Sequence, residues 1–118
     1  MIKSLIKNIG PDAYTEGYNV LILFGTECPD ELKDACIIHE YQEKPLDHML
    51  HVGGKIRLGN TEYTIEKIGD DEIVNKNLSA LGHISLMFSP DYDILSGSVL
   101  LSPYRLPALN VGDMITFD

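Results

Sequence analysis

Short apolar stretches, each bounded by glycine, proline or polar residues, recur along the whole chain. They have the length of β-strands and are rich in Ile, Val, Leu and Tyr, which is typical of a mainly β protein. The stretches that we expect to be extended are residues 19–24, 37–41, 55–58, 61–68, 84–88, 98–102 and 114–117. Residues 2–9 fit a helical and an extended period equally well. Because turns of a few residues cannot make parallel crossovers, the pattern predicts a mainly β, antiparallel, barrel-like fold in a single domain over residues 1–118.

One β-hairpin and two short helices are the best-defined local elements. Residues 55–58 and 61–68 alternate apolar and polar side chains, and the Gly-Asn pair between them supplies the positive φ of a two-residue hairpin loop. Residues 30–36 follow a proline and begin with acidic side chains, which favours a short helix. Residues 71–81 are expected to form one or two helical turns that end at the glycine after them.

Composition restricts the class of protein further. The chain has 118 residues, with 18 acidic and 9 basic side chains and a formal charge of −9. Nucleic acids and anionic lipids attract Lys and Arg, so this charge argues against both and suits a partner with a basic face. No apolar stretch reaches the ~20 residues of a membrane span, and the N-terminus lacks the features of a signal peptide. Because Cys28 and Cys36 form no C-x-x-C motif, we expect a reduced, cytoplasmic protein.

Several kinds of reactive site find little support in the sequence. Gly54 and Lys55 lack the remainder of a phosphate-binding loop, and no G-x-G-x-x-G is present, so we expect no nucleotide or other cofactor. His48 and His51 form one loose H-x-x-H without a second pair of ligands, so we assign no metal site. The apolar surroundings of Cys36 would raise the pKa of its thiol, which disfavours a cysteine nucleophile.

His39 is the most promising reactive residue. It ends the apolar run that begins at Cys36, and Glu40 follows it. A neutral imidazole is a good nucleophile near pH 7, and a neighbouring group that fixes its tautomer would leave one nitrogen for a phosphoryl group. His83 follows a glycine at the expected helix–strand junction, where backbone donors could hold phosphate. Two histidines that meet across a sheet would suit reversible phosphoryl transfer, although the sequence does not show that they meet.

Several motifs together resemble one family. The segment 30–40 contains Cys-Ile-Ile-His, residues 50–53 read Leu-His-Val-Gly, residues 56–59 read Ile-Arg-Leu-Gly, residues 77–83 read Asn-Leu-Ser-Ala-Leu-Gly-His, and residues 111–117 read Val-Gly-Asp-Met-Ile-Thr-Phe. In these motifs, their spacing and its length, the chain resembles the glucitol/sorbitol-specific IIA component of the bacterial phosphoenolpyruvate-dependent sugar phosphotransferase system. Two departures are that His48 has no counterpart we can place, and that Ser96 and Gly97 stand where the family pattern suggests Pro-Gly.

The resemblance implies a phosphocarrier. In this family a IIA protein takes a phosphoryl group from the phosphocarrier protein HPr onto a histidine and passes it to a cysteine of the IIB component, while the membrane IIC component imports the sugar alcohol. By position, His39 corresponds to the phosphorylated residue. His51 and His83 match family histidines, and we expect both to support the site. Because two partners must dock on it in turn, we expect His39 to be exposed.

Two other interpretations stay open. A non-catalytic binding or regulatory module on the same β scaffold would have structural histidines, a buried His39 and no phosphorylation. A metal-binding protein would use His48 and His51. An unpaired edge strand would also allow a homodimer, although no residue requires one. If His39 is phosphorylated, Nε2 is the less hindered of its two nitrogens.

Overall fold

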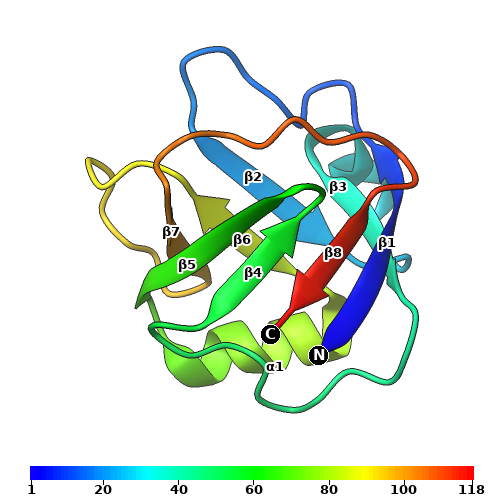
Figure 1. The fold of residues 1–118 in the computed structure, drawn as a ribbon. Helices are drawn as coiled ribbons and strands as arrows, with labels where there is room; N and C mark the ends of the chain where they lie inside the picture. Colours follow the sequence, from blue (N-terminus) through cyan, green and yellow to red (C-terminus); the bar gives the residue numbers. More distant parts are fainter.

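The structure, a computed structural model that describes residues 1–118, is a closed barrel of eight strands (Figure 1). Around the barrel the strands follow the order β1, β3, β2, β6, β7, β5, β4 and β8. Their bounds are β1 (Ile2–Ile9), β2 (Val20–Phe24), β3 (Ile37–Tyr41), β4 (Lys55–Leu58), β5 (Thr61–Ile68), β6 (Ile84–Met87), β7 (Ser98–Ser102) and β8 (Met114–Phe117). The prediction of a mainly β barrel with short helices is therefore confirmed, and the N-terminal segment is a strand.

Two helices accompany the barrel. The 3₁₀ helix η1 (Asp30–Ala35) lies between β2 and β3, and the α-helix α1 (Asp71–Leu81) lies between β5 and β6. With 11 residues, α1 is longer than the one or two turns predicted. It begins where the Asp70 side chain accepts a hydrogen bond from the Ile73 N–H at 3.1 Å, and it ends at Gly82 with a left-handed φ of 66°. Neither helix is long and apolar enough to cross a membrane.

The prediction of a purely antiparallel sheet is wrong in two places. Strands β2 and β3 pair in parallel, as do β6 and β7. In each case the connection, residues 25–36 and 88–97, is long enough to return the chain to the end of the barrel where it started, which a turn of a few residues cannot do. Because the barrel is closed, it also has no unpaired edge strand through which a dimer could form.

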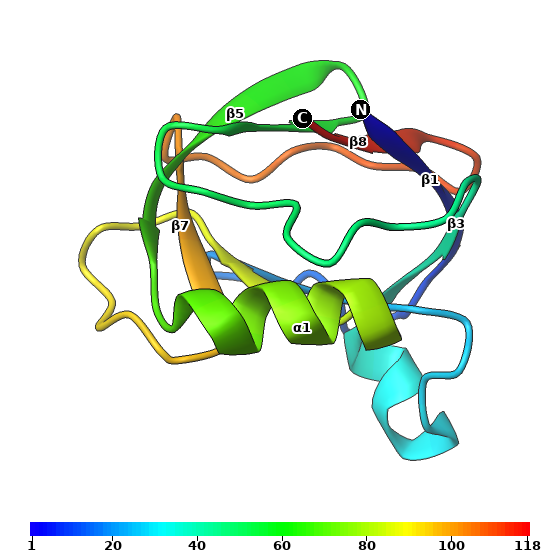
Figure 2. The same cartoon turned by 90° about the horizontal axis from the view of Figure 1, so that it is seen from below.

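The barrel interior is the main hydrophobic core, to which every strand contributes. Strand β1 shows the alternation that fills it, because Ile2, Ser4 and Ile6 are buried while Lys3 is exposed. Helix α1 lies across one end of the barrel, as Figure 2 shows, and buries Val74 and Leu78 against it. This placement brings the C-terminal end of α1 next to β3, and the candidate site lies between them.

A buried amide fixes the long connection between β3 and β4 to α1. The Asn75 side chain accepts hydrogen bonds from the Met49 and Leu50 N–H groups at 2.9 and 2.7 Å. Its own NH₂ group donates to the Leu50 and Asp71 carbonyls, both at 3.0 Å. Figures 1 and 2 show this connection running beside the helix. The helix is therefore held from the barrel side by apolar packing and from the loop side by hydrogen bonds.

Candidate functional site

His39 lies on the inward face of β3 and is almost completely buried. Ile37, His39 and Tyr41 alternate toward the barrel interior, and Ile6 of β1 pairs directly with His39. Only 1% of the His39 surface is exposed. The expectation of an exposed His39 is therefore wrong for this structure. The reason is that the C-terminal end of α1, where Gly82 sits, covers the ring from the open end of the barrel.

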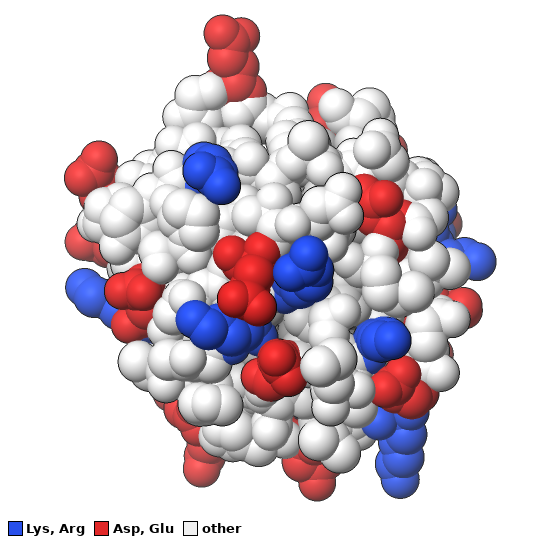
Figure 3. Space-filling view, in the orientation of Figure 1, with Lys and Arg blue, Asp and Glu red and all other residues white.

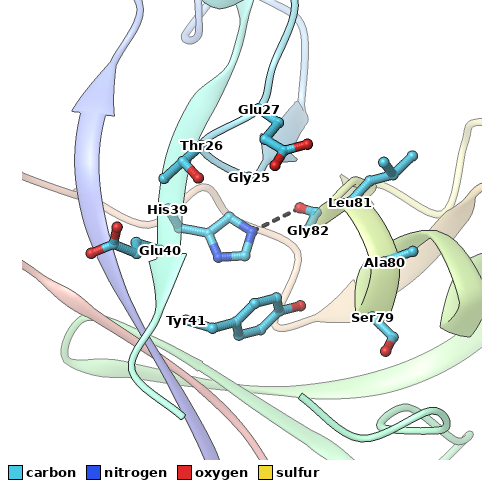
Figure 4. Close-up of a pocket in the computed structure, with 10 residues that line it drawn as sticks. All are labelled: Gly25, Thr26, Glu27, His39, Glu40, Tyr41, Ser79, Ala80, Leu81 and Gly82. Carbon is cyan, nitrogen blue, oxygen red and sulfur yellow. Dashed lines mark hydrogen bonds between the residues drawn. The ribbon is translucent and has the colours of Figure 1, made fainter. Parts of the chain in front are cut away.

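Both ring nitrogens of His39 have hydrogen-bond partners. Nδ1 lies 2.5 Å from the Ser4 hydroxyl oxygen, and Nε2 lies 2.7 Å from the Gly82 carbonyl oxygen (Figure 4). A carbonyl oxygen can only accept, so Nε2 carries a proton and donates it to Gly82. In the neutral ring the Ser4 hydroxyl then donates to Nδ1. Turning the ring by a half rotation would put carbon atoms at both contacts, which supports this ring orientation.

The surroundings of His39 favour its neutral form. Burial lowers the pKa of His39 below the usual value, and the hydrogen bond to the Gly82 carbonyl opposes this only in part. The Tyr41 ring meets the His39 ring edge-on with centroids 5.3 Å apart, and Phe117 lies 6.3 Å away. The Tyr41 hydroxyl donates to the Leu78 carbonyl at 2.5 Å, which ties the end of α1 to β3. An imidazole that is neutral near pH 7 keeps a lone pair for nucleophilic chemistry.

A pocket of about 270 Å³ opens beside His39. Its walls come from the turn after β2, from β3 and from the last turn of α1: Gly25, Thr26, Glu27, His39, Glu40, Tyr41, Ser79, Ala80, Leu81 and Gly82. In Figure 4 the His39 ring points toward Gly82, whereas the Glu40 carboxylate points away from the ring. The group that contacts Nδ1 is therefore Ser4, not the adjacent Glu40.

The pocket has two carboxylates and no cationic side chain in its walls. The end of α1 presents the Gly82 carbonyl to His39, and the Gly82 N–H is bonded to Leu78 within the helix end. A helix C-terminus carries the negative end of the helix dipole, so it does not attract phosphate. In the turn after β2, the N–H groups of Thr26 and Glu27 have no acceptor within the protein. This turn, and not the helix end suggested by the sequence, offers donors to an anion.

His83 does not meet His39. Its ring stacks on Phe24 with centroids 4.4 Å apart, and its Nδ1 donates to the Leu23 carbonyl at 3.2 Å. His83 is partly buried and does not line the pocket, although Gly82 next to it does. It can act on the site indirectly, through the packing of β2, whose last residue precedes the pocket turn, or through its chain neighbour Gly82.

The remaining predicted residues lie away from the pocket. His51 is exposed and does not line it. His48 is also exposed, with Nε2 3.5 Å from an Asp71 carboxylate oxygen. No group of three or more His, Cys, Asp or Glu side chains is arranged to hold a metal ion. Cys36 is buried, and burial raises the pKa of its thiol to about 11, so it is not a thiolate near neutral pH.

The sequence motifs did not single out Ser4, Thr26 or Tyr41 as site residues. For Ser4 a signal was present, because it is a lone hydroxyl between Ile2 and Ile6 on the buried face of a strand. A buried polar side chain requires a hydrogen-bond partner, and here that partner comes from a strand 35 positions away. That pairing depends on the strand order, which the sequence pattern did not predict.

The fold and the pocket define a small closed β-barrel that presents one neutral histidine to a helix-covered pocket. The family model described as "PTS system glucitol/sorbitol-specific IIA component" matches residues 1–116. The chain belongs to this family, which implies a role as a phosphoryl carrier of the phosphotransferase system.

A solved structure agrees with this assignment. The crystal structure of a PTS system IIA component from Enterococcus faecalis V583 matches with a TM-score of 0.87 and 32% sequence identity over 98% of each chain. No curated protein matches the chain at a significant level. The resemblance seen in the sequence motifs is therefore confirmed at the level of family and fold.

Proposed function

We propose that this protein accepts a phosphoryl group from phospho-HPr on His39 and passes it to the IIB component for the uptake and phosphorylation of glucitol/sorbitol. The observation that carries the proposal is the family match over residues 1–116, combined with the position of His39 as the histidine that lines the pocket. No nucleotide is required, because the phosphoryl group moves between protein side chains. The protein would work in the cytoplasm and meet the membrane only through its permease partner.

The proposed reaction is a nucleophilic substitution at phosphorus. The Nε2–P bond forms as the N–P bond of the donor phosphohistidine breaks, and the electron pair of that bond returns to the donor imidazole. A loose transition state of this kind is stabilised by positioning and by electrostatics. Nε2 is the nitrogen that faces the pocket, so the Gly82 carbonyl must move away before the phosphoryl group can approach. The burial of His39 thus implies an opening of the α1 end during docking.

Charge compensation for the phosphoryl group would come from two sources. The Thr26 hydroxyl and the N–H groups of Thr26 and Glu27 would donate to its oxygens from the pocket turn. The carboxylates of Glu27 and Glu40 at the pocket repel a dianion, so a partner with a basic docking face must supply cations. HPr and the IIB component would each bring such a face in turn, through small, transient interfaces.

The other predicted histidines would act indirectly. His83 would hold the wall formed by β2 through its contacts with Phe24 and Leu23. His51 forms no hydrogen bond with a pocket residue, so its supporting role stays a prediction. These assignments make His83→Ala and His51→Ala suitable comparison variants for His39.

The direct test is phosphorylation of the purified protein by phosphoenolpyruvate, enzyme I and HPr, followed by intact-mass analysis at alkaline pH, because phosphohistidine is acid-labile. We expect one phosphoryl group on the wild type, mapped to His39, and none on His39→Gln. Retention of the native fold by His39→Gln, checked by circular dichroism, is needed because the ring is buried. A folded His39→Gln protein that still accepts a phosphoryl group would refute the assignment of the residue.

The burial of His39 favours one alternative, a non-catalytic binding or regulatory module whose histidines are structural. This alternative predicts no mass change with an HPr that phosphorylates another IIA protein in the same reaction mixture. It also predicts that His39→Gln alters stability and nothing else. Phosphorylation of the wild-type chain at His39 would exclude it.

A further inference from the structure

The Ser4 hydroxyl, which lies behind the His39 ring, has no role in the carrier mechanism described so far. Ser4 is completely buried on the inward face of β1, and its only side-chain hydrogen bond is the 2.5 Å contact with His39 Nδ1. The register of the barrel explains the contact, since Ser4 pairs with Tyr41 on β3, two residues from His39. Strand β8 confines Ser4 from the other side through its pairing with Ile115. The hydroxyl is therefore fixed in place by two neighbouring strands.

The protonation state in this structure does not allow attack by Nε2. Nε2 carries the proton that it donates to Gly82, and the lone pair lies on Nδ1, where it faces Ser4 inside the barrel. A nucleophilic Nε2 requires the opposite tautomer, with the proton on Nδ1. A group beside Nδ1 must then change from hydrogen-bond donor to acceptor. A hydroxyl can do both, whereas a backbone N–H or an ammonium group can only donate.

We infer that Ser4 is a positioning residue that allows His39 to switch tautomer and so makes Nε2 the nucleophile. The inference rests on the proposed function. In the closed state Ser4 donates to Nδ1 while Gly82 accepts from Nε2–H. When the end of α1 moves and the Gly82 contact breaks, Nε2 gives its proton to water and Nδ1 takes up a proton from water. The ring therefore stays neutral, and the new Nδ1–H donates to the Ser4 oxygen. The Nδ1 proton stays in place while the Nε2–P bond forms and the donor N–P bond breaks.

The geometry also explains why the phosphorylated ring would keep its orientation. Once Nε2 carries a phosphoryl group, it can no longer bond to Gly82, so Ser4 is the remaining polar anchor of the ring. Tyr41 and Phe117 flank the ring with aromatic surfaces and do not fix its rotation through hydrogen bonds. Without Ser4 the Nδ1–H group would be buried without an acceptor, which is costly. Ser4 would therefore favour both the reactive and the phosphorylated states.

The test compares wild type, Ser4→Ala and Ser4→Thr with Ser98→Ala, a buried serine outside the His39 pocket. Phosphorylation rates are measured with phospho-HPr and with phosphoramidate, a small donor that needs no docking surface. We expect Ser4→Ala to react about tenfold more slowly with both donors, the size of one lost hydrogen bond. Ser4→Thr retains a hydroxyl and is expected to react close to the wild-type rate. Ser98→Ala is expected to react like the wild type.

Nitrogen-15 NMR of the His39 ring separates positioning from a general loss of stability. We expect the proton on Nε2 in the free protein and on Nδ1 in the phosphorylated protein. In phosphorylated Ser4→Ala we expect the Nδ1–H signal to show that its hydrogen bond is lost. Equal rates and equal ring spectra for wild type and Ser4→Ala would overturn the inference. A free protein with its proton on Nδ1 would also overturn it, even if no donor phosphorylates the chain. A wild type that gains no phosphoryl group, but has the expected tautomer, would instead count against the proposed function.

Discussion

At the scale of single residues, the neutral state of His39 links folding to pH. Burial lowers the pKa of His39 below its ordinary value of 6.5, so below that pH the unfolded chain binds a proton that the folded chain resists. The stability that this group contributes is present above pH 6.5 and is lost as the pH falls toward the folded pKa. The free energy of unfolding cannot change by more than about 1.4 kcal/mol per pH unit for one proton. The other titratable side chains that line the pocket are Glu27, Glu40 and Tyr41.

Urea unfolding between about pH 5 and pH 8 measures this linkage, because His titrates in that range. We expect the free energy of unfolding of the wild type to fall toward pH 5 more steeply than that of His39→Gln. The variant is the control for the carboxylates, which titrate in both proteins. Parallel curves for the two proteins would mean that His39 is not buried as a neutral side chain in solution.

Gly82 is the second residue with a defined role at the site, because its backbone conformation and its close neighbours leave no room for a side chain. Its φ is +66°, and a Cβ there would lie 2.9 Å from the Gly25 nitrogen and 3.0 Å from His39 Nε2. We expect Gly82→Ala to lower the free energy of unfolding by about 1–3 kcal/mol and to disturb the His39 ring. Gly17→Ala is the matched control, because Gly17 has a φ of +77° with nothing within 4 Å of a Cβ.

Thermal unfolding of both glycine variants separates backbone strain from contact. The amount by which the destabilisation of Gly82→Ala exceeds that of Gly17→Ala measures the close approach of the α1 end to β2 and His39. Equal losses in the two variants would show that the helix end does not press on the histidine. Such a result would contradict the buried state in which the α1 end covers His39.

The sequence motif singles out His39 as the candidate histidine, whereas it does not predict the environment of that histidine. Cys-Ile-Ile-His places His39 at the end of an apolar run, which correctly indicates a strand. A strand alternates between two faces, however, and only the barrel register puts His39 on the inner one. The partners Ser4 and Gly82 are distant in sequence, so the expectation of an exposed ring had nothing local to correct it.

At the scale of elements, α1 is held in place by the amide of Asn75. This side chain satisfies the Met49 and Leu50 N–H groups and is only 3% exposed. We expect Asn75→Ala to lower the free energy of unfolding by about 2–4 kcal/mol, because two buried donors lose their acceptor. Helix propensity would act in the opposite direction by at most about 0.7 kcal/mol.

Hydrogen exchange locates the effect of Asn75→Ala. The Met49 and Leu50 amides are expected to exchange faster, while the amides of β6 and β7 keep their protection relative to global unfolding. Asn77→Ala is the control, because Asn77 lies on the same helix and its side chain forms no hydrogen bond within the protein. A change no larger than that of Asn77→Ala would show that apolar packing alone holds the helix.

Local elements were predictable from the sequence where turn chemistry and alternation agree. The hairpin of β4 and β5 pairs as expected, with Leu58 opposite Thr61 across the turn. The parallel pairs β2–β3 and β6–β7 were missed, because pairing between strands depends on where long connections return the chain. Residues 2–9 became a strand because two neighbours, β3 and β8, provide its hydrogen bonds. Tertiary pairing therefore resolved what local periodicity left open.

At the scale of the whole molecule, the net charge of −9 is distributed unevenly. On the face shown in Figure 3, acidic and basic side chains are interspersed and no single-sign patch forms. The pocket, by contrast, is lined by Glu27 and Glu40 without a cation. In η1, which follows in the chain, Asp30 is paired with Lys33, whereas Glu31 adds a further negative charge. A partner with a basic docking face would thus be attracted to the molecule as a whole and would find complementary charge at the pocket.

This distribution predicts that the encounter with phospho-HPr, the proposed donor, depends on salt. Long-range attraction mainly raises the association rate and is screened by salt. We expect the association rate constant, measured by stopped-flow, to fall at least about tenfold between low salt and about 0.5 M salt. The double variant Glu27→Gln, Glu40→Gln is expected to bind more slowly at low salt than Glu16→Gln, Glu62→Gln, which changes the net charge equally at exposed positions outside the pocket. If both double variants slow binding equally, net charge alone steers the partner, and the carboxylates at the pocket do not direct docking to His39.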